Sequence, residues 1–259
     1  MGWILESASK SPWDPYTRRM PGLYRDHGVV LRTIKLGEAD RIVSFMTQGN
    51  GKVRAVAKGV RKSGSRFGAR LEPTSHVMLQ CYRGRELDVV TQVETVEAHR
   101  SLRENYTTLT HAVSMLEAVD QVAQEREPAP ALYRMLTGAL RTMDVSPSPV
   151  VTPGFFWKLL SLEGYHPHLD GCVRCGDEDG PFPAFDLGDG GVLCATCGRL
   201  GGRRVAPEAL EFLGRLVNGE LRLAMASPPE RTHVLEVERL GIAALEHHSE
   251  RRLRSAALL

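Results

Sequence analysis

Residues 41–57 read RIVSFMTQGNGKVRAVA, with an apolar, β-branched run on each side of Asn50-Gly51. Asn-Gly between two such runs is the strongest short-range signal for a β-hairpin. The second run, residues 52–57, alternates charged and apolar side chains, as a half-buried strand does. We therefore predict two antiparallel strands that turn at Asn50-Gly51.

More strands are predicted on both sides of this hairpin. An apolar run begins at Val29, and residues 74–82 and 86–93 form another strand pair that turns at 83–85. Five strands with no helix between them favour a small antiparallel barrel, and the OB-fold is one such barrel that often binds oligonucleotides. An SH3-like barrel would give much the same pattern, so the strands alone leave the barrel type open.

The rest of the chain is predicted to be helical. Thr152-Pro153 has the composition of a helix start, with Thr as the N-cap and Pro in the first turn, and Gly164 is expected to end that helix. Apolar spacing and Pro and Gly positions predict further helices. The predicted segments are 102–126, 131–143, 152–164, 207–218 and 233–256.

Four of the five cysteines form two C-x2-C pairs that are separated by 18 residues. Two such pairs supply four thiolates, the closed tetrahedral ligand set of a structural zinc site, whereas redox chemistry needs only one pair. The sequence therefore predicts one structural Zn²⁺ on Cys172, Cys175, Cys194 and Cys197. Residues 170–197 hold six acids and one base, so we expect this finger to hold the fold together and not to bind DNA.

A long basic segment lies in the first half of the chain. No acidic residue occurs between Asp40 and Glu72, and this span contains eight cations. Uncompensated cations on a hairpin and its following loop favour binding to a phosphate backbone. The predicted DNA-binding residues are Arg41, Lys52, Arg54, Lys58, Arg61, Lys62, Arg66 and Arg70. Phe45 and Phe67 are candidates for stacking on bases, with burial in the barrel as the alternative.

Several familiar enzyme and membrane signals are missing from the sequence. There is no phosphate-binding G-x-x-x-x-G-K-[ST] loop, no H-x-E motif of a zinc deaminase, and no acid pair with catalytic spacing. No apolar run approaches the length of a membrane span, and the first residues do not resemble a secretory signal. We therefore expect a cytoplasmic, nucleoid-associated protein that is not an enzyme.

Motifs between about residues 27 and 197 resemble, in the same order, the RecO family of bacterial recombination mediators. They are Gly28-Val-Val-Leu-Arg32, Gly37-Glu-Ala-Asp-Arg41, Gly51-Lys52, Ala57-Lys-Gly-Val-Arg-Lys-Ser63, Leu71-Glu-Pro73, Phe156-Trp-Lys-Leu-Leu-Ser-Leu-Glu-Gly-Tyr165, Cys172-Val-Arg-Cys-Gly176 and Gly190-Gly-Val-Leu-Cys194. The resemblance implies binding of single- and double-stranded DNA and annealing of complementary strands. It also implies work with RecR to displace single-strand-binding protein and load RecA, which would be an indirect partner.

The expected fold class is α+β: an N-terminal small antiparallel β-barrel of the OB-fold type, then a helical domain with a four-cysteine zinc-binding insertion. The exposed faces around Phe155–Leu162 are expected to meet a partner protein, although an aromatic helix face is more often core. The alternative function is a zinc-ribbon module of the transcription or ribosome machinery that binds RNA or protein. The expected segments are an N-terminal extension (1–22), an OB-fold DNA-binding domain (23–100), a first helical part (101–165), a four-cysteine zinc finger (166–204) and a C-terminal helical part (205–259).

Overall fold

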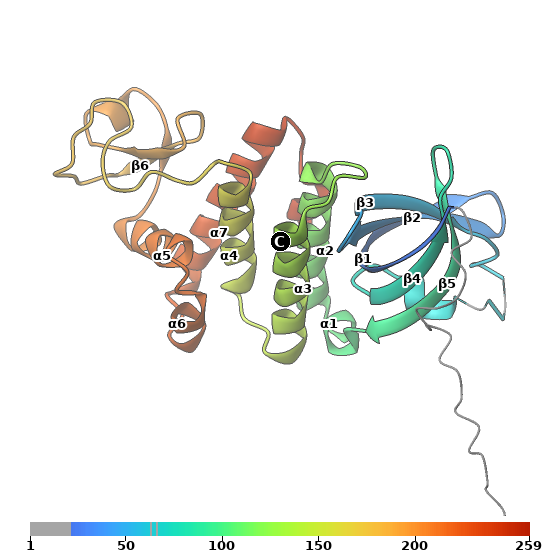
Figure 1. Ribbon diagram of the computed structural model, residues 1–259. Helices are drawn as coiled ribbons and strands as arrows, with labels where there is room; N and C mark the ends of the chain where they lie inside the picture. The colour runs from blue at the N-terminus through green and yellow to red at the C-terminus, as the bar shows by residue number, and fades with distance from the viewer. Residues whose placement is uncertain (1–21, 63, 66) are drawn as a thin grey trace, which may run out of the picture.

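The computed structural model describes residues 22–259 except Ser63 and Arg66. The expected extension therefore lies outside the described residues up to residue 21, and so does the predicted DNA contact Arg66. Figure 1 shows a β-barrel at one end of the molecule, a layer of helices in the middle and a small module containing β6 at the other end. Within the described residues, no helix is both long and apolar enough to span a bilayer.

Five strands form a closed barrel in the order β1-β2-β3-β5-β4, so the predicted OB-type barrel is confirmed. All neighbouring pairs are antiparallel except β3 and β5, which pair in parallel over two residues. The interior is apolar and includes Val43, Phe45 and Leu79. The strands are β1 (Leu23–Leu36), β2 (Asp40–Thr47), β3 (Gly51–Ala57), β4 (His76–Tyr82) and β5 (Asp88–Glu97).

The predicted hairpin is present, but its turn differs in detail from the prediction. Thr47 pairs with Gly51 across the two strands, so the loop has three residues, Gln48–Asn50, and Gly51 is the first residue of β3. Gly51 has a φ of +65°, and a Cβ on it would lie 1.8 Å from the carbonyl oxygen of Glu127. Glycine is thus needed here for the backbone conformation and for the close approach of the helical part.

The helical layer contains seven α-helices among the described residues. Its first predicted helix is interrupted at Asn105, whose side chain accepts a hydrogen bond from the backbone N–H of Thr108 and so caps the second helix. The short helix over residues 221–226 was not predicted. The helices are α1 (Arg100–Glu104), α2 (Tyr106–Val122), α3 (Pro130–Val145), α4 (Val151–Leu162), α5 (Pro207–Val217), α6 (Leu221–Ala226) and α7 (Arg231–Ser249).

Helix α4 forms the centre of this layer. Phe156, Trp157 and Leu159 are buried, and the Trp157 indole N–H donates to the carbonyl of Val237 in α7 at 3.0 Å. Most of Phe155–Leu162 therefore packs as core, which is the alternative that the sequence analysis kept open, and Lys158 and Leu162 are its exposed positions. Thr152 does not cap α4 as predicted but lies buried inside its first turn, whereas Gly164 does follow the helix end with a φ of +94°.

The barrel and the helices share one apolar core. Strand β1 has consecutive buried residues: Val30 faces the barrel interior, while Val29 and Leu31 join the helical core together with Met46 of β2. A register shift between Val30 and Arg32 marks a β-bulge at this point. One wall of the barrel is thus covered by the helical layer, chiefly α2, and only the remaining walls and loops face solvent.

Candidate metal centre and nucleic-acid interface

The cysteine module is built on two similar turns beside a small sheet, β7-β6-β8. In each turn the glycine after the second cysteine donates its N–H to the carbonyl of the first, from Gly176 to Cys172 and from Gly198 to Cys194, both at 2.8 Å. The two turns thus have the same hydrogen bond, and the fold brings their four sulfur atoms together. The strands are β6 (Ala184–Asp186), β7 (Gly191–Leu193) and β8 (Arg203–Arg204).

The four predicted metal ligands come together. Their sulfur atoms all lie within 4.8 Å of one another, and the Sγ atoms of Cys175 and Cys194 are 3.7 Å apart. A tetrahedral site with Zn–S distances of about 2.3 Å requires S···S distances of about 3.8 Å. Backbone N–H groups, that of Cys194 first, lower the pKa of Cys172 to about 6. Burial and the neighbouring thiols raise the pKa of Cys197 to about 12, so the four thiols do not all favour the thiolate without a metal. The spacing of the four sulfur atoms is what suits the cluster to hold one metal ion.

Arginine partly offsets the acidic charge of this module. Arg174 forms ion pairs with Asp186 and with Asp189, and its guanidinium also donates to the carbonyl of Cys197 at 3.4 Å. This side chain is therefore engaged inside the module. His166, just upstream, contacts the hydroxyl of Ser161 through its Nδ1 and is not part of the cysteine cluster.

Among the predicted DNA-binding cations that the structure describes, Arg41, Lys52 and Arg54 are paired with carboxylates of the same chain. Arg41 binds Glu72 at 2.8 Å, and Arg54 lies 3.5 Å from Glu125. Lys52 donates to the backbone carbonyl of Asp120 at 2.7 Å, its Nζ lies 3.9 Å from the carboxylate of the same residue, and burial lowers the pKa of this lysine. Such cations are already partly neutralised, so they offer less to a phosphate than the sequence suggested.

The pairs of Lys52 and Arg54 belong to an ionic junction between the barrel and α2 that the sequence analysis missed. Arg32 of β1, two strands away in the barrel, also binds Asp120, at 2.7 Å. In the opposite direction, Arg126 reaches from the loop after α2 to the fully buried carboxylate of Asp88 at 2.8 Å. The signal that could have indicated this junction is the run of acids at 120–127, which complements the basic segment.

The remaining described cations of the basic segment are exposed on the loop between β3 and β4. These are Lys58, Arg61, Lys62 and Arg70. The Arg61 guanidinium donates to the carbonyl of Gly37 at 3.2 Å. A carbonyl is neutral, so this contact does not neutralise the charge of Arg61. The structure therefore brings four of the predicted cations to one exposed loop and its 3₁₀ turn, η1 (Gly68–Leu71).

Both candidates for base stacking lie in the barrel core. Phe45 is 0% and Phe67 is 1% exposed, and each packs in the apolar cluster inside the barrel. Phe45 points inward because its strand alternates, and Phe67 closes the barrel where the loop enters η1. Both rings thus take the alternative position in the barrel core, where a base cannot stack on them. Cys81, the fifth cysteine of the chain, is fully buried in the same core.

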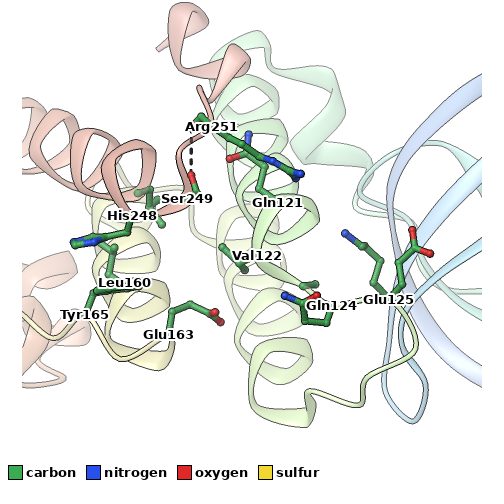
Figure 2. A pocket seen from close by; sticks show the side chains of 13 residues that line it. Gln121, Val122, Gln124, Glu125, Leu160, Glu163, Tyr165, His248, Ser249 and Arg251 are labelled. Carbon is green, nitrogen blue, oxygen red and sulfur yellow. Dashed lines mark hydrogen bonds between the residues drawn. The ribbon is translucent and has the colours of Figure 1, made fainter.

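A cavity of about 580 Å³ lies between the ends of α2, α4 and α7, with Lys52 on its barrel side. Figure 2 shows Tyr165 and His248 on one side of it and Gln124 and Glu125 on the other. The ring of Tyr165 stacks on that of His248 at 3.8 Å. Burial raises the pKa of Glu163 and lowers those of Lys52 and His248. The lining charges have both signs, so this cavity is not a simple anion site.

Comparisons with known proteins agree with this architecture. Residues 20–99 match the family profile described as recombination protein O N terminal, and residues 103–257 match recombination protein O C terminal. A DNA repair protein RecO from a Nocardioides strain is 43% identical over 242 residues, covering 91% of this chain and 98% of that protein. The DNA repair protein RecO of Cutibacterium acnes is 43% identical over 244 residues, with the same coverage. The chain therefore belongs to the RecO family of DNA repair proteins.

Proposed function

We propose that this protein is a recombination mediator that binds single- and double-stranded DNA through the exposed loop of its OB-type barrel. The observation that carries the proposal is the set of exposed cations Lys58, Arg61 and Lys62 on the loop between β3 and β4, with Arg70 exposed farther along the same loop. Arg41, Lys52 and Arg54 of the basic segment are engaged in ion pairs within the chain and contribute less to the proposal. Membership of a DNA repair family favours DNA over the ligands of a zinc-ribbon module.

The physical basis of binding is the release of condensed counterions. Each phosphate that a Lys or Arg neutralises frees cations, so the affinity for single strands falls with salt at a slope of about −0.7 per contact. Three or four loop cations then give a slope of about −2 to −3. Because Phe45 and Phe67 are buried, this loop offers charge without these two stacking rings, and binding should depend weakly on sequence. A dense cationic loop would also lower the repulsion between two complementary strands and so promote annealing.

The cysteine cluster is proposed to hold one structural zinc ion. Four cysteines fill a tetrahedral shell and leave no position for a substrate, so the ion would stabilise the fold of residues 166–204. The module lies at the opposite end of the molecule from the barrel (Figure 1), which supports a role outside the DNA contact. In this proposal the protein performs no catalysis and acts with RecR to displace single-strand-binding protein and help load RecA.

The test is a triple variant, Lys58→Glu, Arg61→Glu and Lys62→Glu, titrated with single-stranded oligonucleotides at several salt concentrations. We expect weaker binding at low salt and slower annealing of complementary oligonucleotides. The slope of log affinity against log salt concentration should become less steep by about 2. Arg222→Glu in α6 is the control, since this exposed residue lies among the helices away from the barrel. Unchanged affinity and slope in a folded triple variant would place the DNA on another surface.

A further inference from the structure

A second basic feature lies beside the loop, where η1 approaches α1. A cavity of about 380 Å³ is lined by Arg70 of η1 and by Arg100 and Arg103 of α1. The other lining residues are neutral: Phe67, Gly68, Ala69, Ser75, Thr95 and Ala98. Figure 1 shows that α1 directly follows the end of β5, which brings these arginines to the barrel. Among the described residues, three cations thus surround one cavity with no acid in its lining.

Arg103 is held in place by neutral groups. Its Nε donates to the hydroxyl of Thr74 at 3.1 Å, and its Nη2 donates to the hydroxyl of Ser75 at 2.6 Å. A guanidinium has five N–H donors, so these two bonds leave others for a ligand. Burial lowers the pKa of Arg103, while the carboxylates of Glu72 and Asp144 act in the opposite direction, so the site holds this charge at a net cost in solvation. A bound anion would offset that cost.

The backbone next to this arginine is strained. Thr74 has a φ of +74°, although a β-branched residue rarely adopts this conformation, and it is fully buried. Its N–H donates to the carbonyl of Val30 at 3.0 Å, which holds this backbone in place, and its hydroxyl accepts from Nε of Arg103. Strain of this kind concentrates at functional sites. The strained residue therefore orients the charged side chain of the cavity.

We propose that this arginine cavity binds a phosphate of the backbone of single-stranded DNA, next to the strand held by the loop. The inference rests on the proposed function and adds a separate site to it. Arg70 links the two surfaces, because η1 ends the same loop that carries Lys58, Arg61 and Lys62. The cavity volume lies in the range that accommodates drug-sized ligands, so a phosphate with its sugar has room to enter.

The experiment compares Arg100→Glu and Arg103→Gln with the unchanged protein, using a single-stranded oligothymidylate. Arg100 is exposed, so the first change should leave folding intact, and Arg222→Glu in α6 supplies the same charge change elsewhere. One phosphate contact contributes about 0.7 to the slope of log affinity against log salt concentration. A variant that lacks this contact should therefore lose about fivefold more affinity at 0.1 M salt than at 1 M salt. We expect at least this loss for Arg100→Glu, together with a slope that is smaller by about 0.7.

Amide hydrogen exchange gives an independent readout of location. Oligothymidylate should protect residues 68–71 and 98–103 in the unchanged protein and should protect them less in Arg100→Glu. If Arg100→Glu and Arg103→Gln bind like Arg222→Glu while the triple loop variant loses binding, the cavity inference is wrong and the proposed function stands. If the loop variant also binds normally, both the cavity and the loop are excluded as the DNA surface.

Discussion

Replacing Gly51 by alanine tests the junction between the barrel and the helices. A Cβ at this position would lie 1.8 Å from the Glu127 carbonyl oxygen and 2.4 Å from its carbon, both of which are backbone atoms that cannot rotate away. The loop after α2 must therefore move outward. That movement breaks the bond from the Arg126 N–H to the Lys52 carbonyl at 2.9 Å and the longer bond from the Lys52 N–H to the Gln124 carbonyl.

The expected loss of stability in Gly51→Ala has three contributions. A left-handed conformation costs an alanine about 1–2 kcal/mol, and each lost backbone hydrogen bond costs about 1 kcal/mol. The expected loss is thus about 3–4 kcal/mol in the free energy of unfolding. Gly37→Ala is a matched control, because Gly37 has a φ of +58° but a Cβ there meets nothing within 4 Å. The control should lose only the conformational part, about 1–2 kcal/mol.

The assay is urea unfolding followed by circular dichroism, with amide hydrogen exchange of β3 as a local measure. The difference between the two variants, about 2 kcal/mol, reports the close approach of the helical part and not the glycine conformation. Equal losses for Gly51→Ala and Gly37→Ala would refute the reasoning. Faster exchange in β3 of Gly51→Ala alone would support it, since only this variant separates the loop from the strand.

Two further predictions concern the metal cluster and a buried histidine. Cys172→Ser should abolish the single zinc ion expected by elemental analysis and speed amide exchange over 172–199, with little loss of DNA affinity; zinc retained at full occupancy would contradict the assignment. His76 is buried, and burial lowers its pKa, so the folded state prefers the neutral ring. Its contribution to stability is present above the unfolded pKa of about 6.5 and declines as the pH falls below it. His76→Gln should therefore flatten the fall in the free energy of unfolding between about pH 7 and 5, and an equally steep fall would refute this origin.

Much of the fold could be predicted because its signals are local. Alternation along residues 52–57 defines a strand, and the spacing of the four cysteines defines their cluster, since each pattern is complete within a few residues or two short turns. The break at Asn105 was missed because apolar spacing continues across it, while the cap depends on one side chain. The burial of Phe67 was not predictable from its loop, because its environment comes from strands elsewhere in the chain.

The ion pairs of the basic segment show why counting charges in the sequence could not separate paired cations from exposed ones. Lys52 and Asp120 are 68 residues apart, and no local pattern joins them. The sequence nevertheless indicates indirectly that one wall of the barrel is covered. Val29-Val30-Leu31 is apolar on both faces of its strand, which is typical of a strand buried on both sides, so this wall of the barrel must be covered.

The strand register then extends this argument to the cations. Val29 pairs with Met46, and Met46 pairs with Lys52, so the three residues lie in adjacent positions on the outer wall of the barrel. Lys52 must therefore border the covered wall, where a cation requires a partner from the covering helix. The loop residues Lys58, Arg61 and Lys62 follow the end of β3 and lie beyond this wall. Register, and not the number of cations, separates the residues of the junction from the exposed loop cations of the proposed DNA surface.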